Sequence, residues 1–366
     1  MRIGLIIYGS LEALSGGFLY DRKLVEYLRK QGDDVEVISL PWRDYGHHLG
    51  DNLSGGLLHR LAGLDLDLLI QDELNHPSLV WLNRRLRRRA HYPIMTIVHH
   101  LRGCEPRPAW QNRIYLWIER NYLDTVDAFI YNSQTTRQVV GSVLENDRPG
   151  VVAYPAGDRL SPQISEQEII ARAHHPGPLK LFFLGNIVPR KGLHVLLDAL
   201  NKVPKDRWLL SVAGGSSLDK VYNRQVQFRA QTPYLDGMVH FLGSLEADEL
   251  KSQMRDSHLL VLPSFYEGFG IAYLEGMGFG LPALGTTAGA AKEIITHGEN
   301  GFLIEPGDSD ALAQCLRVAA RDRDVLEKLS LGARQRYLAQ PTWEDSTRRI
   351  REFLCTFVRD SRGFQN

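Results

Sequence analysis

The stretch 257–280, SHLLVLPSFYEGFGIAYLEGMGFG, limits most strongly what this chain can fold into. An apolar run over 259–262 predicts a short buried strand, which Pro263 and Ser264 end. A loop with two glycines follows, and a second apolar run over 271–279 predicts a helix. Because a strand that passes through a glycine loop into a helix is typical of parallel sheets covered by helices, we expect an α/β fold.

The same loop carries groups that suit a nucleotide sugar. Gly268 and Gly270 have no Cβ, so the backbone can approach a ligand closely. The unpaired N–H groups at a helix start favour negative charge such as a phosphate. Glu267 and Glu275 only accept hydrogen bonds when ionised, which suits the vicinal hydroxyls of a sugar. The pattern therefore predicts a nucleotide-sugar site, although many α/β proteins with other ligands share it.

Length and composition narrow the class of protein further. With 366 residues, two domains of about 170 residues each are expected. The 43 basic residues balance the 43 acidic ones, which argues against a nucleic-acid partner. Three scattered cysteines fit a reducing compartment. The N-terminus resembles no signal peptide and no run of 18 apolar residues occurs, so we expect a cytoplasmic protein.

The first half of the chain repeats the strand–loop–helix pattern. An apolar strand over 3–8 leads to Gly16 and Gly17, and an amphipathic helix over 18–29 follows, which again places backbone amides at a phosphate-sized site. A strand over 93–98 ends in His99-His100. Since ligands of open α/β sheets bind at the carboxyl ends of the strands, a histidine there is a candidate site residue, although most adjacent histidines are incidental.

The second half restarts after a change of composition. Residues 154–179 hold four prolines and two glycines, which predicts an interdomain linker. A strand over 180–185 then leads to Arg190 and Lys191, which open a helix over 193–200. Two cations at a helix start are unfavourable beside the helix dipole unless an anion lies there too. We therefore expect these two residues to bind an anionic group.

A longer stretch carries a family resemblance. Residues 263–308, PSFYEGFGIAYLEGMGFGLPALGTTAGAAKEIITHGENGFLIEPGD, resemble the donor-site signature of the family 4 retaining glycosyltransferases. That signature has two glutamates separated by seven residues, a loop of small residues, and a strand that begins Asn-Gly. The positions that match it are Glu267, Glu275, Gly289, Glu293, Asn300 and Gly301.

The resemblance implies the GT-B fold, in which two Rossmann-like βαβ domains face a central cleft and the last helix crosses back to the first domain. It predicts an N-terminal acceptor domain over 1–165, completed by a crossing helix in 342–366. The C-terminal donor domain would cover 166–341.

The resemblance also implies roles for individual residues. The catalytic set would be Glu267, His99, Arg190 and Lys191, with His100 as the second choice for the histidine. Glu267 and the histidine would hold the hexose, Arg190 and Lys191 the diphosphate, and Glu275 the ribose. Leu245 would lie where the nucleobase is read by backbone contacts. The full donor-binding set is Gly16, Gly17, Gly185, Arg190, Lys191, Leu245, Glu267, Gly268, Phe269, Gly270 and Glu275.

The implied reaction moves a hexosyl group from a nucleoside diphosphate sugar to a carbohydrate or lipid-linked acceptor hydroxyl, with retention at the anomeric carbon. The donor would be a UDP-, GDP- or ADP-sugar, with UDP favoured, and no other cofactor is implied. Asp65-Leu66-Asp67 resembles a metal motif of the other glycosyltransferase fold but precedes its strand, so we expect no metal. The alternatives are a nucleotide-sugar epimerase and a catalytically silent nucleotide-sugar-binding protein.

Five arginines crowd a short segment of the first half: Arg84, Arg85, Arg87, Arg88 and Arg89. One interpretation is a solvated face that complements a helix C-terminus. The other is a patch that binds anionic lipid headgroups, which would place the protein peripherally at the inner face of a membrane.

Overall fold

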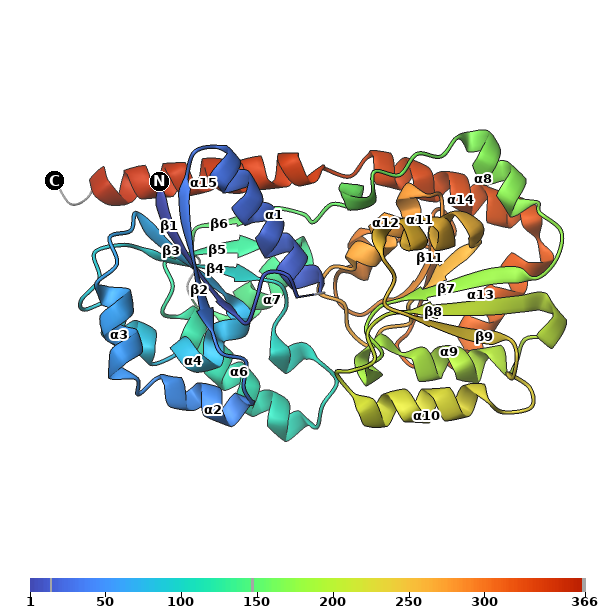
Figure 1. Ribbon diagram of the computed structural model, residues 1–366, viewed down its shortest axis with the longest axis horizontal. Coiled ribbons are helices and arrows are strands. Elements are labelled where there is room, and N and C mark those ends of the chain that lie inside the picture. The colour runs from blue at the N-terminus through green and yellow to red at the C-terminus, as the bar shows by residue number, and fades with distance from the viewer. Residues whose placement is uncertain (14, 146–147, 364–366) are drawn as a thin grey trace. The chain divides into compact units, whose positions relative to one another are not determined.

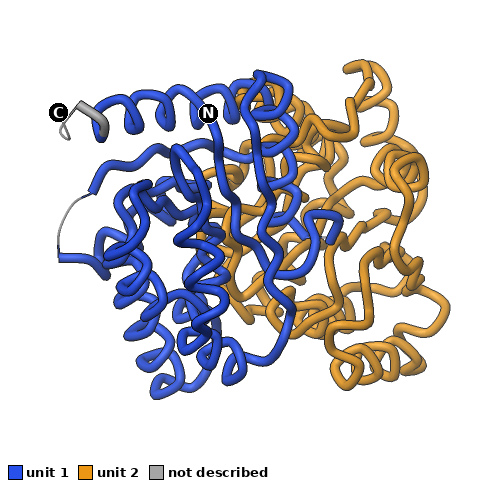
Figure 2. Tube along the Cα trace, turned by 60° about the vertical axis from the view of Figure 1, so that its left-hand side comes forward, with its two compact units in different colours: residues 1–155, 343–366 blue, residues 156–342 orange. Residues whose placement is uncertain are grey.

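The computed structural model describes residues 1–13, 15–145 and 148–363. Residues 14, 146–147 and 364–366 lie outside this part, including the last three of the predicted segment 342–366. Two compact units make up the chain, Met1–Pro155 with Trp343–Asn366, and Ala156–Thr342 (Figure 2). The sequence-based division lay between 165 and 166.

The N-terminal unit contains a parallel sheet of six strands in the order β2-β1-β3-β4-β5-β6 (Figure 1). The strands are β1 (Arg2–Tyr8), β2 (Asp34–Leu40), β3 (Leu68–Asp72), β4 (Ile94–Val98), β5 (Ala128–Tyr131) and β6 (Gly150–Val152). The central strands β3 and β4 are buried over their whole length, as their apolar runs predict. After β2 the chain returns to the other side of β1, where β3 to β6 are added in order, so the strand order switches between β1 and β3. Ligands of α/β sheets bind at the carboxyl ends of the strands beside such a switch point.

Eight α-helices belong to the described part of this unit: α1 (Gly16–Lys30), α2 (Tyr45–Asp51), α3 (Gly55–Ala62), α4 (His76–Leu79), α5 (Leu82–Leu86), α6 (Ala109–Leu123), α7 (Gln134–Val143) and α15 (Trp343–Gly363). Helix α1 begins two residues earlier than predicted, because the hydroxyl of Ser15 accepts a hydrogen bond from the amide of Phe18 and caps it. The last helix, α15, packs against α1, and Arg351 Nε lies 2.6 Å from Asp33 Oδ2.

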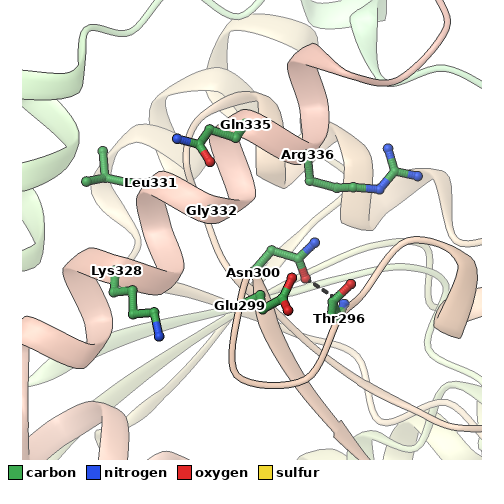
Figure 3. A pocket seen from close by; sticks show the side chains of 8 residues that line it. All are labelled: Thr296, Glu299, Asn300, Lys328, Leu331, Gly332, Gln335 and Arg336. Atoms are coloured by element: carbon green, nitrogen blue, oxygen red, sulfur yellow. Dashed lines mark hydrogen bonds between the residues drawn. The ribbon is translucent and has the colours of Figure 1, made fainter.

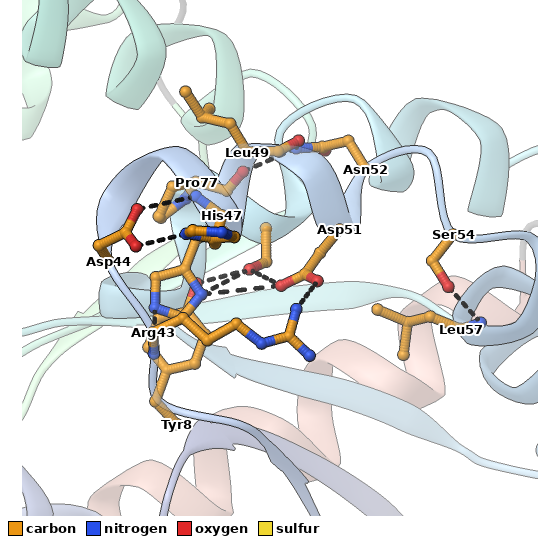
Figure 4. A network of polar contacts seen from close by, with 12 residues as sticks. Tyr8, Arg43, Asp44, His47, Leu49, Asp51, Asn52, Ser54, Leu57 and Pro77 are labelled. Atoms are coloured by element: carbon orange, nitrogen blue, oxygen red, sulfur yellow. Dashed lines mark hydrogen bonds and ion pairs between the residues drawn. The ribbon is translucent and has the colours of Figure 1, made fainter.

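A polar network joins the short helices α2 and α4 (Figure 4), and Asn52 extends it to α5. The side chain of buried Asn52 donates to the carbonyl of Pro77 at 2.7 Å and accepts from the amides of Trp81 and Leu82 at 2.8 and 3.0 Å. Asn52 therefore satisfies the amides at the start of α5, which has no side-chain cap of its own. This network fixes the position of the arginine-rich segment that follows.

The C-terminal unit contains a second parallel sheet, with the order β12-β11-β10-β7-β8-β9. Its strands are β7 (Leu179–Leu184), β8 (Trp208–Ala213), β9 (Val239–Gly243), β10 (Leu259–Val261), β11 (Ala283–Thr286) and β12 (Gly301–Ile304). Strands β7 and β10 are parallel neighbours although about 80 residues separate them. Strands β8 and β9 lie on one side of this pair and β11 and β12 on the other, so the strand order switches between β7 and β10. The loops after these two central strands therefore lie together at the carboxyl ends of the strands.

The α-helices of this unit are α8 (Glu166–Ala173), α9 (Leu193–Leu200), α10 (Lys220–Ala230), α11 (Ala247–Asp256), α12 (Ile271–Gly278), α13 (Ser309–Arg321) and α14 (Arg323–Leu338). Helix α8 lies inside the segment 154–179 that the sequence predicted to be a linker. Ser165 and Glu168 form a capping box at its start, and Ile169 is fully buried. The prolines and glycines around it hid this helix from the sequence analysis.

None of the helices in the described ranges is both long enough and apolar enough to span a lipid bilayer.

Candidate functional site

The loops after β7 and β10 bring three predicted residues together. Lys191 Nζ donates to Glu267 Oε1 at 2.6 Å, and Arg190 Nη1 lies 4.0 Å from Glu267 Oε2. Arg190 Nη1 also donates to the carbonyl of Tyr266 at 2.6 Å. The hydroxyl of Ser264 donates to Glu267 Oε1 at 2.6 Å, a contact that the sequence analysis missed. The group is a compact cluster of two cations and one carboxylate.

Burial and charge set the protonation of this cluster. Burial by itself would raise the pKa of Glu267, but Lys191, Arg190 and the Ser264 hydroxyl outweigh it and lower the pKa to about 2. Burial lowers the pKa of Lys191, an effect that Glu267 opposes and Arg190 reinforces. The carboxylate therefore stays ionised at neutral pH. It is also the anion that relieves the unfavourable placement of the two cations before α9, so that placement alone does not require a ligand.

Two glycines allow the loops to come this close. Gly192 has φ +71°, and a Cβ there would lie 2.1 Å from the carbonyl oxygen of Pro263. Gly289 has φ +75°, and a Cβ there would lie 2.1 Å from the carbonyl oxygen of Glu267. The amide of Ala290 donates to the same oxygen at 2.9 Å. The glycine in the small-residue loop of the signature thus has a mechanical role, because it fixes the backbone that carries Glu267.

The loop 267–270 leads directly into α12. Gly270, with φ +100°, stands at the N-cap, and no side chain caps the helix. Gly268 and Gly270 are half-buried in this loop, and Phe269 between them is buried. The amides at the start of α12 are therefore available to an acceptor from outside the helix.

Glu275 is buried within α12, where its Oε1 accepts a hydrogen bond from Arg159 Nε at 2.7 Å. No sequence pattern pointed to Arg159, which lies in the segment predicted as a linker. A ribose bound at Glu275 would have to share its carboxylate with this guanidinium.

The other predicted donor-binding residues of this unit lie at strand ends. Gly185 follows β7, and a Cβ there would lie 3.5 Å from Lys191 Cε, so Gly185 borders the cluster. Leu245 lies half-buried in the loop between β9 and α11.

In the N-terminal unit, the predicted residues follow β1 and β4, which flank β3 beside the switch point of the sheet. Gly16 and Gly17 are the first residues of α1, and not of the loop before it as predicted. A Cβ on Gly17 would lie 3.2 Å from His99 Cδ2, so this glycine makes room for the imidazole. His99 Nε2 lies 3.2 Å from Oδ1 of buried Asp21. His100, the second choice, instead contacts Glu105 at 2.8 Å.

Buried carboxylates surround His99. Burial by itself would lower the pKa of His99, but Asp21, Asp72 and Glu73 raise it to about 9. Burial raises the pKa of both Asp72 and Glu73 to about 8. A neighbouring group joins Glu73, His76 and Glu119, whose ligand-type atoms lie within 4.8 Å of one another.

We interpret Asp72 and Glu119 as structural hydrogen-bond acceptors. Asp72 accepts the amide of Leu74 at 2.9 Å, and Glu119 accepts the amides of Arg102 and Gly103. Both carboxylates thus cap short turns, so their burial needs no bound cation to explain it.

Asp21 is the site-adjacent residue that the sequence analysis overlooked in this unit. It lies on the buried face of α1 together with Phe18, Val25 and Leu28. An acid at an apolar position of an amphipathic helix is costly to bury unpaired. The 3.6-residue periodicity of α1 places Asp21 at such a position, so the sequence could have identified it as a candidate.

A hollow of about 480 Å³ lies elsewhere on the C-terminal unit, between α14 and the turn before β12 (Figure 3). It is lined by Thr296, Glu299, Asn300, Lys328, Leu331, Gly332, Gln335 and Arg336. None of the residues predicted to be catalytic or donor-binding lines it, although Asn300 belongs to the family signature.

Comparison with known proteins agrees with the geometry of the C-terminal unit. Residues 165–336, which contain the cluster and α12, match the family described as glycosyl transferases group 1. The C-terminal unit of the chain contains a group 1 glycosyltransferase domain. The predicted family resemblance is confirmed.

Curated relatives of this glycosyltransferase act on several sugars. The chain is 27% identical over 263 residues to the D-rhamnosyltransferase WbpZ of Pseudomonas aeruginosa, and the aligned region covers 67% of this chain and 66% of that protein. It is 28% identical over 367 residues to a phosphatidyl-myo-inositol mannosyltransferase of Mycobacterium leprae, which covers 93% and 90%. The match to the sulfoquinovosyl transferase SQD2 of Arabidopsis thaliana, 29% identical, spans 53% of this chain and only 37% of that protein.

Solved structures confirm the fold. Sucrose-phosphate synthase from Thermosynechococcus elongatus superposes with a TM-score of 0.82 at 20% identity, over 97% of this chain and 98% of that one. Anabaena HepE in complex with UDP-glucose gives 0.75 at 18% identity, over 97% and 100%. The glycosyltransferase has the GT-B fold, as predicted.

Proposed function

We propose that this glycosyltransferase moves a hexosyl group from a nucleoside diphosphate sugar to an acceptor hydroxyl, with retention at the anomeric carbon. The observation that carries the proposal is the cluster of Arg190, Lys191 and Glu267 at the switch point of the C-terminal sheet. With one carboxylate against two cations, the cluster keeps a net positive charge. The uncapped start of α12 adds backbone amides to it.

The chemistry asks mainly for stabilisation of negative charge on the departing nucleoside diphosphate. Arg190 and Lys191 are held in place before the reaction, so little free energy is spent on reorienting them as that charge grows. They would supply the positive charge that a divalent cation supplies elsewhere, which is why we propose a metal-independent transfer. Glu275, shared with Arg159, would accept the ribose hydroxyls.

Glu267 suits the hexose better than it suits a covalent role. Its Oε1 already accepts from Lys191 and Ser264, and its low pKa makes it a weak nucleophile. Its Oε2 would accept a sugar hydroxyl. Attack by the acceptor on the face that the diphosphate leaves accounts for retention without a covalent intermediate.

We propose a UDP-sugar as the donor, since HepE, a structure with the same fold, was solved with UDP-glucose. Calorimetric titration with UDP, GDP and ADP in the presence of EDTA tests this directly. Binding of UDP at least tenfold tighter than that of GDP or ADP supports the proposal, and loss of all binding in EDTA contradicts metal independence.

A product assay separates transfer from the alternatives. The donor is incubated alone and then with carbohydrate and lipid-linked acceptors, and the anomeric configuration of each product is read by NMR. An acceptor-dependent product with retained configuration supports the proposal. An epimerised donor without acceptor, or binding without turnover on any acceptor, would identify one of the alternative functions.

We further propose that α5 and α6 rest on an anionic membrane surface. Trp110, Ile114 and Trp117 lie one or two turns apart on α6 and are 63%, 49% and 56% exposed. Arg84 Nη2 donates to Asn121 Oδ1 at 2.8 Å, which places the arginine segment beside the C-terminal end of α6, one turn after Trp117. Exposed tryptophans next to arginines fit a lipid interface.

The structure divides the five arginines. Arg85 donates to the carbonyl of Asn52, and Arg87 pairs with Asp127 at 2.7 Å, so these two also serve the fold. We therefore test Arg88→Gln/Arg89→Gln and Trp110→Ser/Trp117→Ser in sedimentation with phosphatidylglycerol vesicles. Both double variants should bind several-fold more weakly than wild type, while Phe228→Ser, at an exposed position of α10, should not. Equal sedimentation of all four proteins would refute the membrane contact.

A further inference from the structure

The carboxylate of Asp21 lies fully buried beneath His99. Asp21 comes from the second turn of α1, and His99 is the first residue after β4. The imidazole Nε2 lies 3.2 Å from Asp21 Oδ1, and because a carboxylate only accepts, Nε2 carries the proton. Oδ2 of Asp21 has no hydrogen-bond partner among the residues that the structure describes.

Three residues of α1 hold the imidazole. Gly17 leaves the space above Cδ2, and the ring of Tyr20 meets the imidazole edge-on, with 5.3 Å between centroids. Asp21 bonds Nε2 from below, while the main-chain carbonyl of His99 accepts the side-chain amide of Asn132 at 2.8 Å. The ring is thus fixed in place and in orientation, and only 15% of the side chain is exposed.

The charges around the ring explain why Asp21 can be buried. A buried carboxylate with an unpaired oxygen is costly unless a cation balances it. The other titratable groups that act on His99 are Asp72 at the end of β3 and Glu73 after it, and both are acidic. The imidazolium of His99 is therefore the cation that balances Asp21, and the pair loses this charge balance when the ring gives up its second proton.

We infer that Asp21 is a positioning residue for His99, which it holds as an imidazolium with Nε2 bound and Nδ1–H left for the substrate. In the described part of the chain Nδ1 makes no hydrogen bond with the protein. A charged Nδ1–H donor suits an oxygen that gains negative charge during transfer, or a sugar hydroxyl beside it. The role in transfer rests on the proposed function, whereas the state of the ring does not.

The first test reads the ring directly and needs no activity. Histidine side chains are labelled with ¹⁵N, the signal of His99 is assigned by its loss in His99→Gln, and the titration of the ring is followed by NMR. In wild type His99 should stay charged until about pH 9. In Asp21→Asn its midpoint should fall by at least one pH unit, a tenfold change in the protonation constant.

Two variants control this measurement. Asp33→Asn removes another buried aspartate of the same unit, one that pairs with Arg351, and should leave the midpoint of His99 unchanged. Asp21→Glu keeps the charge and should retain a high midpoint, and Asp21→Ser takes the place of Asp21→Asn if that variant does not fold. An unchanged His99 midpoint in every folded variant that lacks the Asp21 carboxylate would overturn the inference.

The second test concerns the reaction. In wild type the activity should fall above about pH 9, and in Asp21→Asn this fall should begin at least one unit lower. At pH 8 the variant should lose about twofold in kcat if the midpoint falls by one unit and about tenfold if it falls by two, with KM for the donor within twofold. A shifted NMR midpoint with an unchanged pH–rate profile would overturn the role of the pair in transfer. Absence of transfer by wild type would overturn the proposed function and leave the NMR result standing.

Discussion

The buried pair of Lys191 and Glu267 allows the sharpest test of the site. The pKa of Glu267 falls from 4.5 to about 2 in the folded chain. At about 1.4 kcal/mol for each pH unit, its surroundings favour the charged form by roughly 3 kcal/mol. The side chains are only 17% and 7% exposed, so solvent screens this interaction little. Removal of one partner leaves the other buried without compensation.

We expect Lys191→Met and Glu267→Gln each to lower the free energy of unfolding by about 3 kcal/mol at pH 7.5. The double variant should recover most of that loss, because neither charge then lacks a partner. Activity should behave differently, since both residues would contact the donor: kcat/KM should fall by roughly 100-fold or more in all three variants.

The measurement is a double-mutant cycle by guanidinium unfolding, monitored by fluorescence and paired with transfer kinetics on the same preparations. The control pair is Lys202 and Asp310, an exposed ion pair of 2.7 Å in the same unit, whose cycle should give a coupling below about 1 kcal/mol. If the losses of Lys191→Met and Glu267→Gln simply add in the double variant, the two side chains do not form a buried pair, and the geometry described here is wrong.

Three further predictions concern the glycine at the loop crossing, the donor contacts and the buried acids. Gly192→Ala should lower the melting temperature much more than Gly243→Ala. Both glycines have φ near +70°, so an alanine at either position would cost about 1–2 kcal/mol of stability through its backbone conformation. Only at Gly192 would the added Cβ also collide with a carbonyl oxygen. Arg190→Ala should reduce kcat/KM by about 100-fold and also lower the melting temperature, because it removes the bond to the Tyr266 carbonyl and a charge beside buried Glu267; near wild-type kinetics would remove Arg190 from the site. Burial raises the pKa of Glu119 to about 8, so this acid holds a proton in the folded state that the unfolded chain releases above its usual pKa of 4.5. Its contribution to stability is present at low pH and is lost as the pH rises towards 8, so melting temperatures measured from pH 5 to 8 should fall for wild type relative to Glu119→Gln; parallel curves would contradict this.

Much of the fold and part of the site follow from the sequence because they depend on neighbours along the chain. The apolar runs over 3–8 and 259–262 predicted β1 and β10 to within one residue at their ends, because burial on both faces leaves a continuous hydrophobic signal. Arg190 and Lys191 were recognised because two cations before a helix conflict with its dipole, a conflict visible within a few residues.

The partners of these residues could not be read in the same way. Glu267 meets Lys191 across 76 residues, and His99 meets Asp21 across 78. Glu275 was expected to await a ribose, and the structure pairs it with Arg159, 116 residues away in a segment predicted as a linker.

The sequence by itself therefore determined the alternating strands and helices, the glycine loops, and which residue types stand at strand ends. Only the tertiary structure decided which of those ends are neighbours. The reason is physical: the order of strands in a parallel sheet is set by how helices cover both of its faces, and not by local periodicity. Where β7 lies beside β10, and β1 near β4, charges that are distant in the sequence come within hydrogen-bond reach and acquire the pKa values and orientations on which the proposed chemistry depends.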